Sequence, residues 1–338
     1  MAPWRLTIAR IRNDRWTMGS LIVVATVIVL SFAGGPIASR ILGHNGYDQL
    51  PYAANITQKP VGPLSVVPAV NYSAGMLASG ELAPPPKGTP KTLLVFGADG
   101  PVGRDEFIRV LDGGKTSLEI AIGGALIALL IGLPLGAVGG YVGGISDAIV
   151  SRITDTIMAF PLMLFLVFAS VQLDAHIRGI GISWWLPDGV VAEALLIGVF
   201  TSFYPTRLIR AQLFQLREAE FVEAAEMVGA SRWRTLRSHL LPHLVPTILV
   251  WAAVAVATNI LLEIGLSFIG AGVQVSTATW GSLLSTTWGT LFQPQTYNSQ
   301  QFTPWQTIFP TVAVLVSVVS LNQLSEGLRQ ALDPFTRR

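Results

Sequence analysis

Two short patterns in this sequence have the residue types of catalytic or ligand-binding sites. The run GGKTS at 113–117 has the ending of a phosphate-binding loop, but the first glycine of GxxxxGK[ST] would fall on Arg109. His239 and His243 have the i, i+4 spacing of a zinc-ligand pair, but Pro242 interrupts their helix and no general base lies between them. The chain has no cysteine and only four histidines. We therefore predict no metal site and no catalytic residue, and we interpret the chain as a protein that is not an enzyme.

Charged side chains are concentrated in segment 206–242, which holds ten of the 42 in the chain. Apolar residues in its middle have the helical spacing i, i+3, i+4 and i+7, which places them on one face of a helix: Phe221, Ala224, Ala225 and Val228. Four glutamates lie on the other face. Gly229 should end this helix, and Ser231 is a suitable N-cap for a second helix that carries three arginines and ends at Pro242. We predict two short helices joined at a glycine. They form either a docking surface for a soluble partner or a solvated loop with an interfacial amphipathic helix.

The elements that must position this segment are membrane spans. Of all residues, 51% are hydrophobic and 12% are charged, and mean hydropathy is +0.55. The charged share is about half that of an ordinary soluble chain. A spanning helix needs roughly 20 predominantly apolar residues, and six windows approach or exceed that length: 16–39, 120–146, 156–173, 190–206, 244–262 and 302–325. We therefore predict an all-α integral membrane protein with six transmembrane helices, the first of them uncleaved.

Basic residues predict the orientation of these spans. If the amino terminus is cytoplasmic, the segments on the cytoplasmic side hold 14 of the 22 Lys and Arg residues, and they are 1–15, 142–155, 206–242 and 326–338. Seven of the other eight lie in segment 40–119, which is too long for the positive-inside rule to apply. We predict that both termini are cytoplasmic. The resulting divisions are a cytoplasmic segment at 1–15, a first span at 16–39, an external loop region at 40–119 and a core at 120–338 that contains the cytoplasmic loop 206–242.

The external region at 40–119 is rich in turn-forming residues. It holds nine of the 21 prolines and only one short apolar run, Leu93 to Phe96. We predict a loop-rich lid without a core of its own. Its sequons at Asn55 and Asn71 would be glycosylated only in a eukaryotic secretory setting.

The loop at 206–242 resembles the coupling signature of the membrane subunits of bacterial ATP-binding-cassette (ABC) importers. Its matching residues are Glu223, Ala224, Ala225, Gly229, Leu241 and Pro242, and His239 stands where that pattern prefers Ile. In that family the helix inserts into a groove of the ATPase subunit. The resemblance implies that the ATPase-coupling residues are Phe221, Glu223, Ala224, Ala225, Gly229, Ser231, Arg234, Leu241 and Pro242. Glu223 would make the polar contact, and Gly229 would make the bend.

Roughly residues 95–338 resemble the C-type permease subunit of dipeptide and oligopeptide importers. Matching stretches lie at 132–161, 263–281 and 322–334, and GADGPVGRD at 97–105 matches with one extra residue. Gln330 departs from the Asp that this family commonly has. The resemblance implies the type I ABC importer permease fold with a cytoplasmic coupling helix and a long external loop.

The same resemblance implies the function and the partners. The chain would translocate di- or oligopeptides across the bacterial cytoplasmic (inner) membrane, together with a second homologous permease subunit, two ATPase subunits or a homodimer of one, and an external substrate-binding protein. The chain would bind no cofactor, since ATP and Mg belong to the ATPase subunits, and its remaining contacts would be with the lipid bilayer and not with nucleic acid. A non-peptide cargo such as a nickel complex is the alternative within the family.

An ion-driven secondary transporter is the alternative from another class. Such transporters usually carry ionisable side chains near the bilayer midplane, whereas Glu193 and Glu263 lie near the ends of their predicted spans. We assign Asn259, Glu263 and Ser267 as candidate residues of the translocation pathway.

Several residues in and beside the spans have predicted structural roles. Trp280 and Trp288 should lie at the membrane interface, and Pro161 should kink the third span. Four glycines at helical spacing should allow close helix packing: Gly132, Gly136, Gly140 and Gly144.

Overall fold

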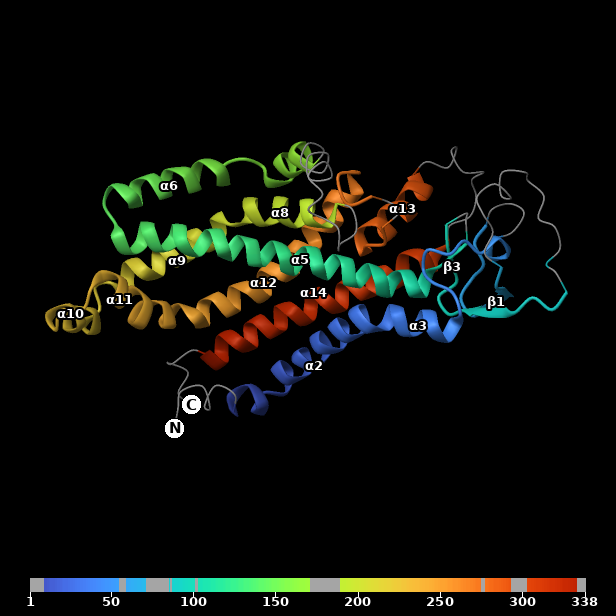
Figure 1. The fold of residues 1–338 in the computed structure, drawn as a ribbon, viewed down its shortest axis with the longest axis horizontal. Coiled ribbons are helices and arrows are strands. Elements are labelled where there is room, and N and C mark those ends of the chain that lie inside the picture. The colour runs from blue at the N-terminus through green and yellow to red at the C-terminus, as the bar shows by residue number, and fades with distance from the viewer. Residues whose placement is uncertain are drawn as a thin grey trace. The chain divides into compact units, whose positions relative to one another are not determined.

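The computed structural model describes residues 9–54, 59–70, 85, 87–100, 103–170, 189–274, 277–292 and 303–332, most of which are helical (Figure 1). The chain forms two compact units. Unit 1 consists of Met1–Ile22, Ile120–Leu262 and Val318–Arg338, and unit 2 consists of Val23–Glu119 and Glu263–Ser317.

Among the described residues, four helices are long and apolar enough to cross a membrane. The first runs over Arg15–Leu42 and comprises α2 (Arg15–Val29), the π-helix η1 (Leu30–Gly34) and α3 (Gly35–Leu42). The second comprises α5 (Glu106–Ala137) and the π-helix η3 (Val138–Val142). The third comprises α11 (Arg232–Thr235), the π-helix η4 (Leu236–Leu240) and α12 (Leu241–Phe268), and the fourth is α14 (Pro304–Leu332).

Two helix boundaries differ from the sequence prediction. Helix α5 begins at Glu106 rather than at residue 120, because the carboxylate of Asp105 caps it by accepting from the backbone N–H groups of Phe107 (2.8 Å) and Ile108 (3.2 Å). The prediction that the second helix of the loop ends at Pro242 was wrong, since the helix continues to Phe268. Proline lacks an N–H and its ring clashes with the carbonyl four residues earlier, but the π-helical turn η4, which ends two residues before Pro242, already departs from the regular α-helical bonding pattern.

The predicted third and fourth spans are interrupted helices. Helix α6 (Ile145–Met158) and a helix over Leu162–Ser170 meet at an angle of 82°, so the predicted kink at Pro161 is a sharp break. The 190–206 window forms α8 (Val190–Thr201) and the start of α9 (Phe203–Leu216). Ser202 between them keeps a helical backbone, and Pro205 cannot donate to the carbonyl of Thr201. Within the described residues, the bent pair would make a fifth span, so the count of six is not confirmed.

Region 40–119 contains a small core, so the prediction that it has none was wrong. Strand β1 (Ser65–Pro68) pairs antiparallel with β2 (Lys91–Leu94), and β3 (Ala98–Asp99) pairs with β4 (Arg104–Asp105). The buried core residues come from short, separated segments, one of which is the 3₁₀ turn η2 (Pro51–Ala53): Leu50, Ala53, Val67, Leu94 and Ala98. No single apolar run in the sequence predicts this core. The sequons at Asn55 and Asn71 lie outside the described residues.

Candidate functional site

The charged loop of unit 1 forms two short helices joined at a glycine, as predicted. Helix α10 (Glu220–Met227) ends at Val228, and Gly229 adopts a left-handed conformation with φ of +88°. The Gly229 N–H donates to the carbonyl of Glu226 (2.9 Å), and the Ala230 N–H donates to that of Ala225 (3.0 Å). This pair of bonds is the Schellman motif, which favours glycine at the left-handed position. The sequence therefore ends α10 at this residue for a local reason.

The second helix begins with the predicted cap. The Ser231 hydroxyl accepts a hydrogen bond from the backbone N–H of Arg234 at 3.4 Å, at the start of α11. The joint is thus fixed on both sides, by a left-handed glycine and by an N-cap. This local pattern sets the bend between the two helices.

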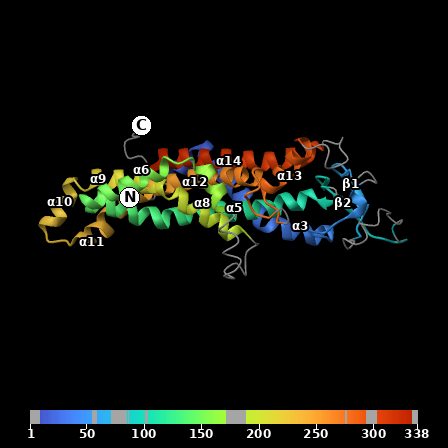
Figure 2. The same ribbon diagram turned by 90° about the horizontal axis from the view of Figure 1, so that it is seen from above.

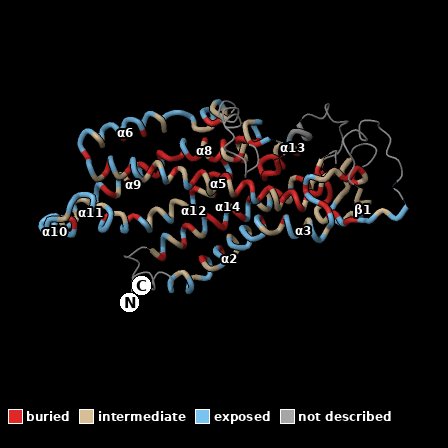
Figure 3. Tube along the Cα trace, in the orientation of Figure 1, coloured by how far each residue is buried: buried red, intermediate tan, exposed pale blue. Residues whose placement is uncertain are grey.

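One side chain of α10 anchors it to unit 1. Val222 is 2% exposed and packs in a cluster with two residues of α9 and two of the α11–α12 helix: Ile209, Leu213, Leu240 and Leu244. Two residues of the predicted apolar stripe face outward, since Phe221 is 38% and Val228 is 90% exposed. Figures 1 and 2 place α10 at one end of unit 1 beyond α9, and Figure 3 shows it largely exposed.

The predicted coupling residues lie mostly on the surface of this loop. Six of them are exposed: Phe221, Glu223, Ala224, Gly229, Ser231 and Arg234. Ala225 is half-buried, and Leu241 and Pro242 lie in the first turn of α12, half-buried and exposed respectively. The loop therefore presents acidic, basic and apolar side chains together. Val222, which attaches the loop, was missed, although it is the one β-branched residue inside α10.

Glycines on α5 and η3 bring α9 close to that helix within unit 1. A Cβ on Gly136 would lie 2.8 Å from the carbonyl oxygen of Thr206, and one on Gly140 would lie 2.5 Å from that of Arg210. Gly132 has similar contacts with Ser202 and Pro205, but a Cβ on Gly144 would meet no atom within 4 Å, so the predicted repeat packs at three of its four positions. Dispersion drives such close approach in lipid, where the hydrophobic effect between helices is absent.

An ion pair joins α6 to α9. Arg210 donates from Nε to one oxygen of Asp147 and from Nη2 to the other at 3.1 Å. Bidentate pairing fixes orientation as well as distance. Helix α9, which carries the anchor for α10, is thus held by α5 on one side and by α6 through this pair.

An apolar groove of about 460 Å³ lies in unit 1 between the end of α5 and the α11–α12 helix. Leu133, Ala137 and Tyr141 line one side, and Trp233 and Leu236 line the other. Trp233 is 68% exposed. The groove runs beside the glycine joint.

Glu263 forms the centre of a buried hydrogen-bond network in unit 2. Its side chain is fully buried and accepts bonds from the hydroxyls of Thr279 (2.7 Å), Ser117 (3.1 Å) and Ser267 (3.1 Å). The backbone N–H of Gly281 is a fourth donor. Buried carboxylates require such partners. Glu263 therefore ties α12 to α5 and to the start of α13 (Trp280–Phe292).

The other two candidate pathway residues are also buried. In unit 1, Asn259 is 1% exposed, and its Nδ2 donates to the carbonyl of Ala121 at 3.0 Å. In unit 2, Ser267 is 8% exposed and bonds to Glu263. These side chains join helices in this conformation, and they present almost no surface to a solute.

The prediction that Trp280 is interfacial was wrong. Trp280 is 3% exposed, and its Nε1 donates to the carbonyl of Val110 at 3.0 Å. Gly114 makes room for it, because a Cβ there would lie 2.8 Å from the indole ring. Gly114 of GGKTS thus packs against this ring, and Gly113 packs against the backbone of Thr279 and Trp280. Trp288 is 40% exposed.

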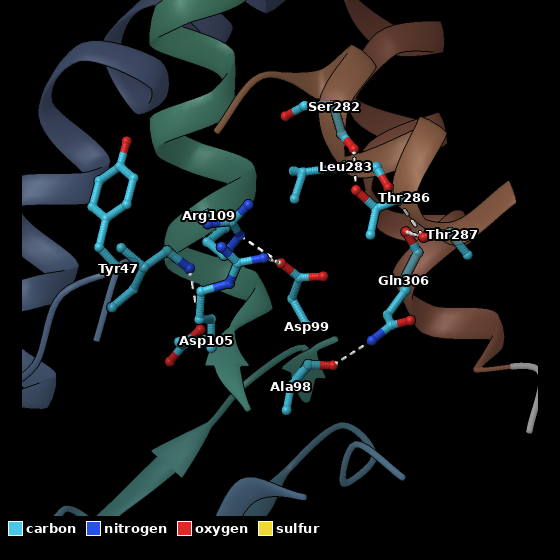
Figure 4. Close-up of polar contacts among 12 residues, drawn as sticks. Tyr47, Ala98, Asp99, Asp105, Arg109, Ser282, Leu283, Thr286, Thr287 and Gln306 are labelled. Atoms are coloured by element: carbon cyan, nitrogen blue, oxygen red, sulfur yellow. Dashed lines mark hydrogen bonds and ion pairs between the residues drawn. The ribbon is translucent and has the colours of Figure 1, made fainter. Parts of the chain in front are cut away.

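A second polar network in unit 2 attaches the small sheets to the helices (Figure 4). Asp99 of β3 pairs with Arg109 of α5 (2.6 Å), and Gln306 of α14 donates from Nε2 to the carbonyl of Ala98 (2.9 Å). Arg109 is 2% exposed, so this pair is withdrawn from water. These contacts fix β3 against two long helices.

His44 adds a titratable contact to this region. Its Nε2 lies 2.9 Å from Oδ2 of Asp105, and its Nδ1 lies 3.2 Å from both the Leu42 carbonyl and the Thr92 hydroxyl. Burial lowers the pKa of His44, but the hydrogen bond and charge of Asp105 raise it, and the net pKa lies above its usual value. The pair therefore favours a protonated His44.

Comparison with known proteins gives one family and related sequences. Residues 118–338 match the family described as binding-protein-dependent transport system inner membrane component. A Brucella ovis protein, provisionally named a peptide permease protein, is 40% identical over 240 residues, which cover 71% of this chain and 72% of that protein. The oligopeptide transport system permease protein OppC of Bacillus subtilis is 28% identical over 338 residues, covering 100% of this chain and 92% of that protein.

A solved structure supports the same fold. The inward-facing MetNI methionine ABC transporter superposes with a TM-score of 0.50 at 19% identity, over 66% of this chain and 96% of that chain. At that identity the likeness concerns the fold alone.

Proposed function

This chain belongs to the family of binding-protein-dependent transport system inner membrane components, and we propose that it is a permease subunit of an ATP-driven importer of oligopeptides. The names of its Brucella ovis and Bacillus subtilis relatives support the peptide cargo. Family membership favours ATP-driven import over the ion-driven alternative. In this role the chain binds no cofactor, and ATP with Mg is bound by partner ATPase subunits.

The observation that carries the proposal is the exposed glycine joint at α10 and α11. Val222 and the ring contact of Phe221 with His243 hold α10 in place, and most of its other side chains are exposed, which leaves them available to a partner. We assign that partner as an ATPase subunit. Glu223 makes a polar contact with it, Ala224 and Ala225 allow close approach, and Gly229 sets the angle between the two helices.

Packing in unit 1 gives the joint a route to the membrane helices. Val222 is buried against Leu213 of α9 and Leu244 of α12, so a pull on α10 acts on both helices at once. Close-packed interiors transmit displacement because they have little free volume. Helix α9 is in turn packed on the glycines of α5. This arrangement supports alternating access driven by movement of the ATPase subunits.

Further parts of the assembly complete this proposal. A second homologous permease subunit and an external substrate-binding protein act with this chain, and both of its termini face the cytoplasm. The excess of Lys and Arg on the predicted inner side supports that orientation. Because Asn259, Glu263 and Ser267 are buried in helix contacts, we assign them to positioning of α5, α12 and α13 in the closed pathway.

Reversal of charge at Glu223 tests the coupling role. The complex is reconstituted in proteoliposomes with its ATPase subunits and binding protein, and ATP-dependent uptake of a labelled oligopeptide is measured together with ATP hydrolysis. Glu223→Arg should lower the uptake per ATP at least tenfold, because a positive charge replaces the negative one at the assigned contact. Ligand affinity of the free binding protein should not change.

A charge reversal elsewhere provides the control. Arg12→Glu changes an exposed charge outside the loop and should leave uptake per ATP unchanged. Normal uptake by the Glu223→Arg complex would exclude the assigned contact. Uptake of a non-peptide solute in place of oligopeptides would refute the cargo and leave the coupling role standing.

A further inference from the structure

The antiparallel strands β1 and β2, which we call the β1–β2 hairpin although residues 69–90 separate them, have an apolar face on their outer side. Leu64 is 71% exposed, and Val66 and its cross-strand partner Leu93 are 61% and 38% exposed. The alternate residues Val67 and Leu94 point into the small core. An antiparallel sheet with one buried face usually presents polar side chains on the other. This hairpin is instead apolar on both faces.

Leu64, one residue of this face, has an energetically unfavourable backbone conformation. Leu64 has a φ of +60° and is the one non-glycine residue with positive φ among those described. A bulky side chain disfavours this conformation. The Leu64 N–H donates to the Val95 carbonyl at 3.3 Å, so the strained residue is fixed beside β2. Because an exposed leucine gains nothing in water from this unfavourable conformation, we expect another surface to cover it.

The hairpin lies at the end of a membrane helix. The Thr92 hydroxyl of β2 lies 3.2 Å from the carbonyl of Leu42, the last residue of α3, and donates to it. Residues Ile37 and Ile41 of α3 are 54% and 78% exposed, as expected of side chains that face lipid. Thr92 lies on the buried face of β2, opposite to Lys91 and Leu93, so its bond fixes the strand pair at the end of the helix and leaves the apolar face on the outer side.

The length of this helix gives the depth of its end. Arg15–Leu42 comprises 28 residues, which span about 42 Å at 1.5 Å per residue. The hydrocarbon core is about 30 Å thick, and the bilayer with its headgroups about 40–45 Å. With Arg15 at one membrane surface, Leu42 lies among the headgroups of the other. The hairpin at Leu42 is thus at the depth where apolar and cationic side chains meet lipid.

We propose that the β1–β2 hairpin is an interfacial anchor whose outer face contacts the lipid leaflet on its own side of the membrane. Leu64, Val66 and Leu93 insert among the upper acyl chains, and the exposed Lys91 lies among the phosphates. The anchor fixes the external region against the bilayer at the point where it leaves α3. The proposal rests on membrane location and is independent of the cargo.

Because the chain has no cysteine, single cysteines can carry a nitroxide spin label at chosen positions. Leu93→Cys and Val66→Cys probe the outer face, Ile37→Cys provides a lipid-facing standard, and Lys87→Cys, in an exposed turn of the same region, provides a water-facing standard. The labelled chains are assembled with the other subunits in nanodiscs of phosphatidylethanolamine and phosphatidylglycerol. Collision rates with oxygen and with a water-soluble nickel chelate are then measured.

The anchor predicts an oxygen-to-nickel collision ratio at positions 93 and 66 that is several-fold higher than at position 87 and shifted toward the value at position 37. A ratio equal to that at position 87 would show that the face is in water and overturn the proposal. Shielding of both labels from both reagents would show that a protein partner covers the face, and would also overturn it. Two separate positions guard against one variant that fails to assemble.

Discussion

Gly140→Ala tests whether close packing of η3 on α9 positions the coupling loop. A Cβ at Gly140 would lie 2.5 Å from the backbone carbonyl oxygen of Arg210 and 2.9 Å from Cβ of Leu213, where ordinary contact begins at 3.4 Å. Backbone oxygen cannot rotate aside. The two helices must therefore separate by about 0.9 Å at this point, the difference between 3.4 and 2.5 Å.

The magnitude follows from two opposing effects. Overpacking costs about 1–3 kcal/mol, whereas replacement of a helical glycine by alanine gains about 1 kcal/mol of helix propensity. Gly19→Ala on α2 separates them, because a Cβ there meets no atom within 4 Å. The free energies of unfolding of the two variants should differ by the overpacking cost alone, about 1–3 kcal/mol, with Gly140→Ala less stable.

Transport should respond as well as stability. Leu213 belongs to the cluster that holds Val222, so displacement of α9 shifts the anchor of α10. We expect Gly140→Ala to lower the uptake per ATP, and Gly19→Ala to leave it unchanged. Unfolding is followed by titration with dodecyl sulfate, and uptake per ATP is measured in proteoliposomes. Equal unfolding free energies for the two variants would refute the packing argument, and lower stability with normal coupling would refute the route through Leu213.

Three further changes have defined outcomes. Gly229→Val places a β-branched residue at φ of +88°, which should lower the free energy of unfolding by about 1–2 kcal/mol and lower the uptake per ATP. Asparagine tolerates this conformation, so Gly229→Asn should retain most uptake. Equal losses of uptake in both variants would argue against a backbone cause. Glu263→Ala leaves its buried donors without an acceptor and should lower the free energy of unfolding by about 3 kcal/mol or more, with a smaller loss for Glu263→Gln, and an unchanged Glu263→Ala protein would disprove the network. The folded pKa of His44 is raised, so its pair with Asp105 stabilises the fold below the unfolded pKa of about 6.5, and that stability is lost as the pH rises through the folded pKa. Thermal unfolding measured at several pH values should show this decline in stability, and His44→Gln should remove it. An identical decline in the variant would assign the effect to another group.

Local patterns were sufficient for much of the fold and part of the site. Four predicted windows lie in helices long enough to span a membrane, and Pro161 marks a break of 82°. The joint at Gly229 and the cap at Ser231 were also predictable, because each depends on the conformational preference of one residue. The resemblance of residues 95–338 to peptide permease subunits agrees with the family match.

Burial could not be predicted in the same way. Helical spacing indicated an apolar stripe on α10 but did not show which side chain packs on the rest of unit 1, and that side chain is Val222, which lies against α9 and α12. Trp280 is of a residue type that is enriched at membrane interfaces. It is buried because Gly114 opens a space 166 positions earlier in the chain and the Val110 carbonyl accepts its N–H.

Sequence alone determined that this chain crosses a membrane, where its charges lie and where its short helices bend, because apolar length, charge position and positive φ are properties of contiguous residues. Tertiary structure decided which side chains hold the parts together. Ser117 and Glu263 are 146 positions apart, and their bond depends on how two helices pack. The exposed face of the β1–β2 hairpin likewise became visible only once the strands had paired, since its apolar residues come from two separate segments.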